Sequence, residues 1–215
     1  MKKILFASLS LFLIISACKK DEEAKPVTPV VNDTTEQIIE IKTSFGTMYM
    51  WLYRETPLHR NNFLGLADTN YFDGSTFHRC IANFMIQGGD PNSKDSDPSN
   101  DGQGGPGYTI PAEIKSTIKH ARGEVAAARL GNAQNPSKAS SGSQFYICVS
   151  TPGTQSLNNE YTVFGKILNG IEVADSIVKQ PQNANNRPLT DIKMDVNVVT
   201  RTRKQLREEF NFTGY

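Results

Sequence analysis

The feature that most constrains the fold is a series of short β-type runs separated by turn residues. The runs are IIEIKTS (38–44), TMYMWLY (47–53), GEVAAARL (123–130), SQFYICV (143–149), YTVFGKI (161–167) and DIKMDVNVVT (191–200). Runs of this composition predict strands, and the first two are joined across Phe45-Gly46 as a hairpin. The runs lack the regular strand and helix alternation of a parallel sheet. We therefore expect a mainly antiparallel barrel or sandwich.

Three other segments have helical character. The stretch 56–74 begins with Thr56 as N-cap and Pro57 at the first helical position, and it closes in an Asp73-Gly74 turn. Its expected apolar side is made of Leu58, Phe63, Leu64 and Leu66. NGIEVADSIV (169–178) predicts a short helix, and RKQLREEF (203–210) is either a terminal helix or a charged tail.

The N-terminus has the form of a secretory signal peptide. Lys2 and Lys3 precede an apolar run, Ile4–Ile15, which is too short for a permanent membrane helix. The following Ser-Ala-Cys resembles the lipobox of bacterial lipoprotein precursors. We therefore expect residues 1–17 to be removed and Cys18 to be lipidated, which predicts an exported protein anchored by lipid to the bacterial cell envelope, facing the periplasm or in the outer membrane.

The rest of the chain divides into a tether, one domain and a tail. Residues 18–36 hold the lipidated cysteine and a polar, Pro-rich flexible tether, residues 37–202 form the domain, and residues 203–215 form the tail. The formal net charge is +1 and basic residues are scattered, so we expect no nucleic-acid partner. We expect the protein to contact the membrane through its N-terminal lipid and to be a monomer.

The sequence lacks the residue patterns of metal sites, of redox cysteine motifs and of a serine nucleophile. His59, His78 and His120 show no metal-ligand spacing, and neither Cys80 nor Cys148 has a C-x-x-C partner. The acidic loop that follows Pro91 does not fit an EF-hand, and SSGSQF lacks the second glycine of a nucleophile elbow. We therefore expect no metal and no cofactor.

The stretch FHRCIANFMIQGGDP (77–91) raises a different possibility. In a strand, alternation places Arg79 on the face opposite to His78 and Cys80. An arginine beside apolar residues and the neutral Gln87 is unusual, because a guanidinium is rarely buried without a carboxylate. It either marks a binding site or extends out of the strand over apolar neighbours.

This stretch, together with GSQFYI and YTVFGKILNGIEVAD, resembles the signature segments of the cyclophilin family of peptidyl-prolyl cis–trans isomerases. The segments occur in the family's order, with GGPGYTIPAE between the first two, and the likeness extends from about Gln37 to about Thr200. The resemblance implies a closed eight-stranded antiparallel β-barrel capped by two helices. It also implies that no cofactor is needed.

The resemblance assigns the site residue by residue. Arg79 matches the catalytic arginine, and the matching substrate-binding positions are Phe84, Met85, Gln87, Ala128, Arg129, Gln144, Tyr146, Leu157 and Tyr161. Tyr146 stands where animal cytosolic members have phenylalanine, which adds a hydroxyl that needs a partner. Ser156 and Tyr161 replace the tryptophan and histidine of the drug-binding members. These departures place cyclosporin affinity in doubt more than activity.

The implied function is isomerisation of X–Pro bonds in exported proteins, with proline-containing unfolded or extended polypeptides as substrates. A rival hypothesis is a non-catalytic module or chaperone that binds proline segments in the same groove. Tyr146 and Ser156 favour this rival, whereas the retained Arg79 argues against it. If Arg79 and Tyr146 both face the groove, Cys148 does so too while Cys80 faces away. The two thiols are then expected to be free and largely buried.

Overall fold

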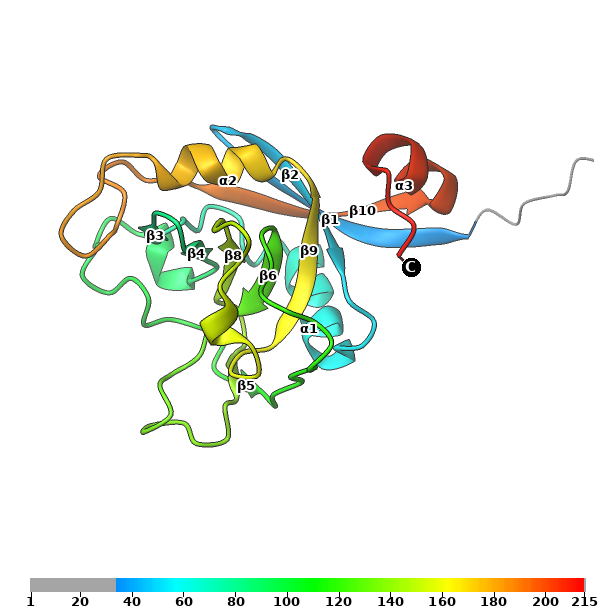
Figure 1. The fold of residues 1–215 in the computed structure, drawn as a ribbon. Helices are drawn as coiled ribbons and strands as arrows, with labels where there is room; N and C mark the ends of the chain where they lie inside the picture. The colour runs from blue at the N-terminus through cyan, green and yellow to red at the C-terminus, as the bar shows by residue number, and fades with distance from the viewer. Residues whose placement is uncertain (1–33, 215) are drawn as a thin grey trace, which may run out of the picture. The chain divides into compact units, whose positions relative to one another are not determined.

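The computed structural model describes residues 34–214, and these residues form a mainly β unit around one large sheet (Figure 1). The predicted signal peptide, the lipidation of Cys18 and most of the predicted tether concern residues outside the described range. The strands of the sheet are β1 (Thr35–Thr43), β2 (Gly46–Leu52), β3 (Arg79–Ile81), β4 (Met85–Gly88), β6 (Glu124–Ala127), β8 (Phe145–Cys148), β9 (Val163–Asn169) and β10 (Met194–Thr202). A separate small sheet pairs β5 (Thr109–Ile110) with β7 (Ser140–Ser141).

The strand order is β10-β1-β2-β9-β6-β8-β4-β3, and every neighbouring pair is antiparallel. This order confirms the expected eight-stranded antiparallel sheet, and it leaves β3 and β10 at the two edges. The chain just before β3 is hydrogen-bonded to the start of β10: Phe77 N donates to Ile192 O at 3.0 Å, and Met194 N donates to Ser75 O at 2.9 Å. These bonds connect the two edges beside β3, so closure into a complete barrel stays a prediction.

The expected hairpin is present, with Thr43 paired to Gly46 across the turn. Gly46 has φ +128°, a conformation that residues with a side chain rarely adopt, and this explains why a glycine follows Phe45. Behind the sheet, the apolar side chains of the strands pack with those of α1 (Pro57–Asp68) and α2 (Ile171–Val178) into one core. These are the two helices expected to cap the sheet.

Helix α1 differs from the sequence-based prediction in two respects. Its buried stripe is His59, Phe63 and Ala67, spaced four residues apart, whereas Leu58 is 51% exposed. Thr56 is the N-cap, but its side chain makes no cap bond. The carboxylate of Glu113 instead accepts hydrogen bonds from Leu58 N at 3.1 Å and His59 N at 2.9 Å. A carboxylate at this end also suits the helix dipole.

The C-terminal segment is a helix, α3 (Arg203–Phe210), rather than a loose charged tail. A capping box between Thr202 and Gln205 starts it. Figure 1 shows α3 at the end of β10, beside the first residues of β1. Its Leu206 packs on Ile38 and Trp51 in a second hydrophobic cluster on the outer side of the sheet. This cluster is separate from the main core.

Two short 3-10 helices complete the described elements, η1 (Pro91–Lys94) and η2 (Gln155–Leu157). Over residues 34–214, no helix reaches the length and hydropathy that a membrane-spanning helix requires.

Candidate active site

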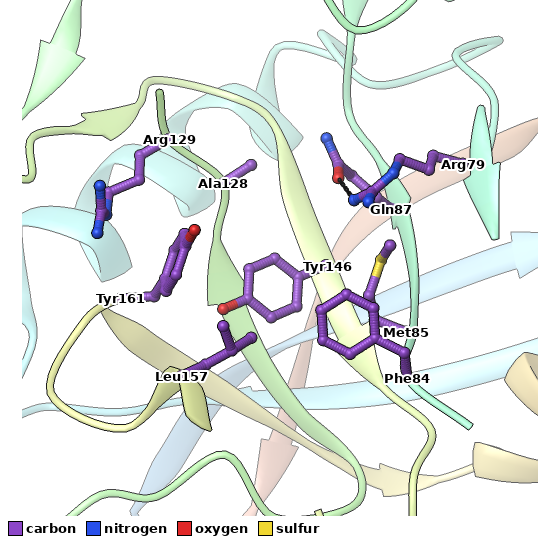
Figure 2. A pocket seen from close by; sticks show the side chains of 9 residues that line it. All are labelled: Arg79, Phe84, Met85, Gln87, Ala128, Arg129, Tyr146, Leu157 and Tyr161. Carbon is purple, nitrogen blue, oxygen red and sulfur yellow. Dashed lines mark hydrogen bonds between the residues drawn. The ribbon is translucent and has the colours of Figure 1, made fainter. Parts of the chain in front are cut away.

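A cavity lies against the outer side of β4, β6 and β8, and it encloses about 420 Å³ including its open mouth. Figure 2 shows its lining, which is made of Arg79, Phe84, Met85, Gln87, Ala128, Arg129, Tyr146, Leu157 and Tyr161. The structure therefore brings together nine of the site residues proposed from the sequence. The tenth, Gln144, is absent from this lining and contacts Gln87 from behind.

Strand register explains why these side chains meet. Arg79 is paired with Gln87 across β3 and β4, and Gln87 is paired with Tyr146 across β4 and β8. Tyr146 is in turn paired with Ala126 of β6. Directly opposed residues project from the same face of a sheet, so the three strands place a guanidinium, an amide and an aromatic ring side by side.

The Arg79 side chain is exposed at one edge of the cavity, and its Nη1 donates to Gln87 Oε1 at 3.3 Å. Among residues 34–214, no carboxylate lies within ion-pair distance of this guanidinium. A guanidinium carries five N–H donors, so several remain available to a ligand. Arg79 is thus held by a neutral partner and keeps its positive charge uncompensated.

A chain of amides sets the orientation of Gln87. Gln144 Nε2 donates to the backbone carbonyls of Gly102 at 3.0 Å and Gly104 at 2.8 Å. Its Oε1 is therefore free to accept from Gln87 Nε2 at 3.1 Å, which leaves Gln87 Oε1 turned toward Arg79. The loop before β5 thus reaches the arginine through two side-chain amides.

The remaining wall of the cavity is mostly apolar. Phe84, Met85 and Leu157 line it together with the rings of Tyr146 and Tyr161. The two tyrosine rings meet edge to face, with centroids 5.9 Å apart and an interplanar angle of 84°. Edge-to-face contact is a favoured geometry for aromatic pairs. Such a wall suits a small apolar ring rather than a charged group.

The hydroxyl of Tyr146 has a partner that the sequence did not reveal. Tyr146 is 4% exposed, and its Oη lies 3.0 Å from Nε2 of His120, which is 1% exposed. Burial raises the pKa of Tyr146 and lowers the pKa of His120, so both are neutral at neutral pH. The need for a partner was foreseeable from the buried phenol, but its identity was not, because the two residues are distant in sequence.

Arg129 belongs to the rim and is tied down by its neighbours. Its guanidinium carbon lies 4.4 Å from the Tyr161 ring centroid, and its Nη2 lies 3.2 Å from Glu160 Oε2. Lys138 also pairs with Glu160 at 2.9 Å. Because the Arg129 side chain is only 3% exposed, it supports the Tyr161 wall and is not available as a free cation.

A buried carboxyl group is found at the start of β6. Glu124 is 5% exposed, and both of its carboxylate oxygens accept from Tyr53 Oη, at 3.1 and 2.9 Å. Burial raises the pKa of Glu124 to about 7, while the Tyr53 hydrogen bond and the charge of Lys166 oppose that rise. Glu124 is not among the residues that line the cavity.

The two cysteines are free and buried, as strand alternation predicted. Cys148 packs with Met85 and Tyr146 on the cavity side, whereas Cys80 packs in the main core. Over residues 34–214, no group of three His, Cys, Asp or Glu side chains could hold a metal ion.

Comparison with known proteins adds a family to this geometry. Residues 38–198 match the family described as cyclophilin type peptidyl-prolyl cis-trans isomerase/CLD. A peptidyl-prolyl cis-trans isomerase of Arabidopsis thaliana is 39% identical over 162 residues, covering 73% of this chain and 92% of that protein. A human peptidyl-prolyl cis-trans isomerase-like protein is 37% identical over 161 residues, covering 72% of this chain and 90% of its own length.

Solved structures give the same result. A cyclophilin type peptidyl-prolyl cis-trans isomerase of Cryptosporidium parvum superposes with a TM-score of 0.67 at 30% identity, covering 76% of this chain and 97% of that one. A structure of the same protein in the presence of the dipeptide Ala-Pro gives a TM-score of 0.66 at 30% identity, with 75% and 98% coverage.

Proposed function

The chain belongs to the family of cyclophilin-type peptidyl-prolyl cis–trans isomerases, and we propose that it accelerates X–Pro isomerisation in exported proteins, with Arg79 stabilising the twisted amide. Isomerase activity itself follows from the family. The single observation that carries the role of Arg79 is its exposed guanidinium at the edge of an apolar cavity, which within residues 34–214 is hydrogen-bonded to neutral Gln87 and paired with no carboxylate.

The reaction needs no nucleophile and no cofactor. Rotation about an X–Pro bond is slow because amide resonance must be broken, at a barrier of about 20 kcal/mol. Catalysis requires only that the twisted amide bind better than the planar one. In the twisted state the prolyl nitrogen becomes pyramidal and regains its lone pair. A guanidinium N–H of Arg79 donates to that lone pair, which a planar amide does not offer.

The cavity supplies the rest of the selectivity for the twisted state. Phe84, Met85, Tyr146 and Leu157 hold the prolyl ring, while Gln87 and the backbone near Ala128 hold the peptide. One preorganised donor contributes roughly 3 kcal/mol, or about a hundredfold in rate. The remaining acceleration comes from fixing the ring so that only the preceding carbonyl moves.

Substitution of Arg79 tests this mechanism. The mature chain and its Arg79→Ala variant are compared in a proline-peptide isomerisation assay, with peptide affinity measured separately. The variant is expected to lose about a hundredfold in kcat/KM while it still binds peptide. Equal rates for the two proteins would refute the role of Arg79. If neither accelerates exchange and both bind peptide, the protein is instead the binding module.

We also propose the cellular setting. The signal-like residues 1–17 and the lipobox-like Ser-Ala-Cys support a lipoprotein that is anchored through Cys18 to the bacterial cell envelope. Its clients are then unfolded or extended exported polypeptides, and the tether separates the domain from the membrane. The tether is shorter than the predicted 18–36, because Thr35 and Glu36 belong to β1.

A Cys18→Ser variant tests the anchor. The unaltered protein is expected to incorporate labelled fatty acid and to partition into detergent, whereas Cys18→Ser does neither. Label in the variant, or none in the unaltered protein, would contradict the proposal. We further propose that the domain closes as a complete barrel. We also propose that it acts as a monomer, and sedimentation of the detergent-solubilised protein checks its oligomeric state.

A further inference from the structure

The contacts of His120 determine which of its ring nitrogens carries the proton. Its backbone N–H donates to Asn158 Oδ1 at 2.8 Å, and because a backbone N–H can only donate, the Asn158 atom must be the oxygen. The same oxygen lies 3.1 Å from His120 Nδ1. An amide oxygen only accepts, so Nδ1 is protonated and Nε2 carries a lone pair. The Tyr146 hydroxyl, 3.0 Å away, therefore donates to Nε2.

The amide of Asn158 is itself fixed from its other end. Its Nδ2 donates to Gln155 Oε1 at 2.6 Å, which agrees with the orientation required by His120. The imidazole is enclosed by rings: Tyr146 lies nearly parallel to it at an interplanar angle of 12°, and Tyr161 meets it edge to face at 85°. Only 1% of the His120 surface is exposed, so its side chain is fully buried.

His120 joins two parts of the cavity wall that come from different segments. Its Nε2 accepts from Tyr146 of β8, and its Nδ1 donates to Asn158, which follows Leu157 and is the C-cap of η2. Its backbone carbonyl also accepts from Thr154 N at 2.7 Å. Tyr146 and Leu157 line the cavity, whereas His120 does not.

We propose that His120 is a positioning residue for the isomerase reaction: as a neutral, Nδ1-protonated imidazole it sets the spacing between the Tyr146 ring and the Leu157 segment, between which the prolyl ring fits. This inference rests on the proposed function. The spacing matters because small displacements of groups that hold a substrate lower the rate severalfold to a hundredfold. The hydrogen bond also keeps the Tyr146 hydroxyl engaged, so that the ring alone serves as the wall.

The tautomer can be measured directly. Nitrogen-15 NMR of the mature protein at pH 7 is expected to show His120 protonated on Nδ1 and unprotonated on Nε2. The Tyr146→Phe variant is expected to keep this tautomer, because Asn158 and not Tyr146 imposes it. An Nε2-protonated or doubly protonated His120 in the unaltered protein would overturn the proposal.

Two variants of Asn158 separate positioning from a merely structural role. Asn158 is half-buried, so its substitution is tolerable for folding. Asn158→Asp keeps an acceptor oxygen for His120 Nδ1 but raises the pKa of the imidazole through its charge. At pH 9, where the imidazole stays neutral, this variant is expected to retain the tautomer and the rate. Asn158→Leu removes that oxygen and is expected to release the tautomer and lower kcat/KM by about tenfold. Equal rates for the two variants, both folded by thermal unfolding, would refute the positioning role.

A double-mutant cycle tests the link to Tyr146. His120→Leu is expected to reduce kcat/KM about tenfold in the unaltered protein. In the Tyr146→Phe background the same substitution is expected to cause a loss at least threefold smaller, since the two residues are coupled. Additive losses would contradict the proposal. If the unaltered protein shows no isomerase activity, the proposed function fails, and the affinity of an Ala-Pro peptide for the same variants then replaces the rate as the readout for His120.

Discussion

Arg79 and Gln87 are paired across β3 and β4, and Arg79 Nη1 donates to Gln87 Oε1 at 3.3 Å. Gln87 is oriented in turn by Gln144, which is bound to the carbonyls of Gly102 and Gly104. The orientation of the proposed catalytic guanidinium therefore depends on a loop that does not contact it.

The first prediction concerns Gln144. Gln144→Leu is expected to lower kcat/KM about tenfold, with most of the loss in kcat, because Gln87 can then turn its amide away from Arg79. Gln103→Leu is the matched control, since the Gln103 side chain donates within the exposed loop, to Ser99 O at 3.0 Å. Steady-state isomerisation kinetics measure both. An unchanged kcat for Gln144→Leu, or an equal loss for the control, would show that the amide chain is not needed.

The second prediction concerns the pH dependence contributed by Glu124. Its folded-state pKa of about 7 lies above the ordinary value of 4.5, so the folded protein binds the proton more tightly than the unfolded chain. The stability that this provides is fully present below pH 4.5 and is lost as the pH rises through 7. Glu124→Gln keeps an acceptor for Tyr53 but cannot ionise.

Urea unfolding at pH 4.5 and pH 8 measures this difference. Relative to the unaltered protein, Glu124→Gln is expected to gain on the order of 3 kcal/mol in free energy of unfolding between the two pH values. Other titrating groups are common to both proteins and cancel in the comparison. A difference between the two proteins that stays constant with pH would mean that Glu124 titrates normally.

The third prediction concerns the thiols. Burial raises the pKa of Cys80 and of Cys148 to about 12, so neither is a thiolate at neutral pH. In the native protein both are expected to resist iodoacetamide. In denaturant without reductant both are expected to react, and mass spectrometry counts the added groups. Failure of both to react after denaturation would reveal a disulfide between them.

The fourth prediction concerns helix α3. Leu206 is fully buried against Ile38 and Trp51, so Leu206→Ala is expected to lower the free energy of unfolding by about 2–4 kcal/mol. Trp51 is the only tryptophan of the chain, and its emission is expected to shift to longer wavelength. Glu208→Ala, on the exposed side of the same helix, is the control and should change neither quantity. Isomerase activity is expected to survive in both.

Much of the architecture could be predicted from local pattern. Strand alternation correctly placed Arg79 opposite to His78 and Cys80, and it correctly separated Cys80 from Cys148. The alternation has a period of two residues and is set by the strand backbone, so it does not depend on what the strands pack against. The α1 prediction was less accurate, because the buried stripe runs through His59, Phe63 and Ala67 and leaves Leu58 on the exposed side of the helix.

The mainly β fold could be predicted from periodicities within single segments, and nine of the ten proposed site residues line the cavity, as the motifs that resemble the family implied. How these residues are held in place could be seen only in the folded chain: Gln144 behind Gln87, Glu113 at the start of α1, and His120 between Tyr146 and Asn158. These partners come from segments far apart in the chain. Hydrogen bonds of buried polar groups depend on which segments meet in space, and no local pattern specifies that meeting.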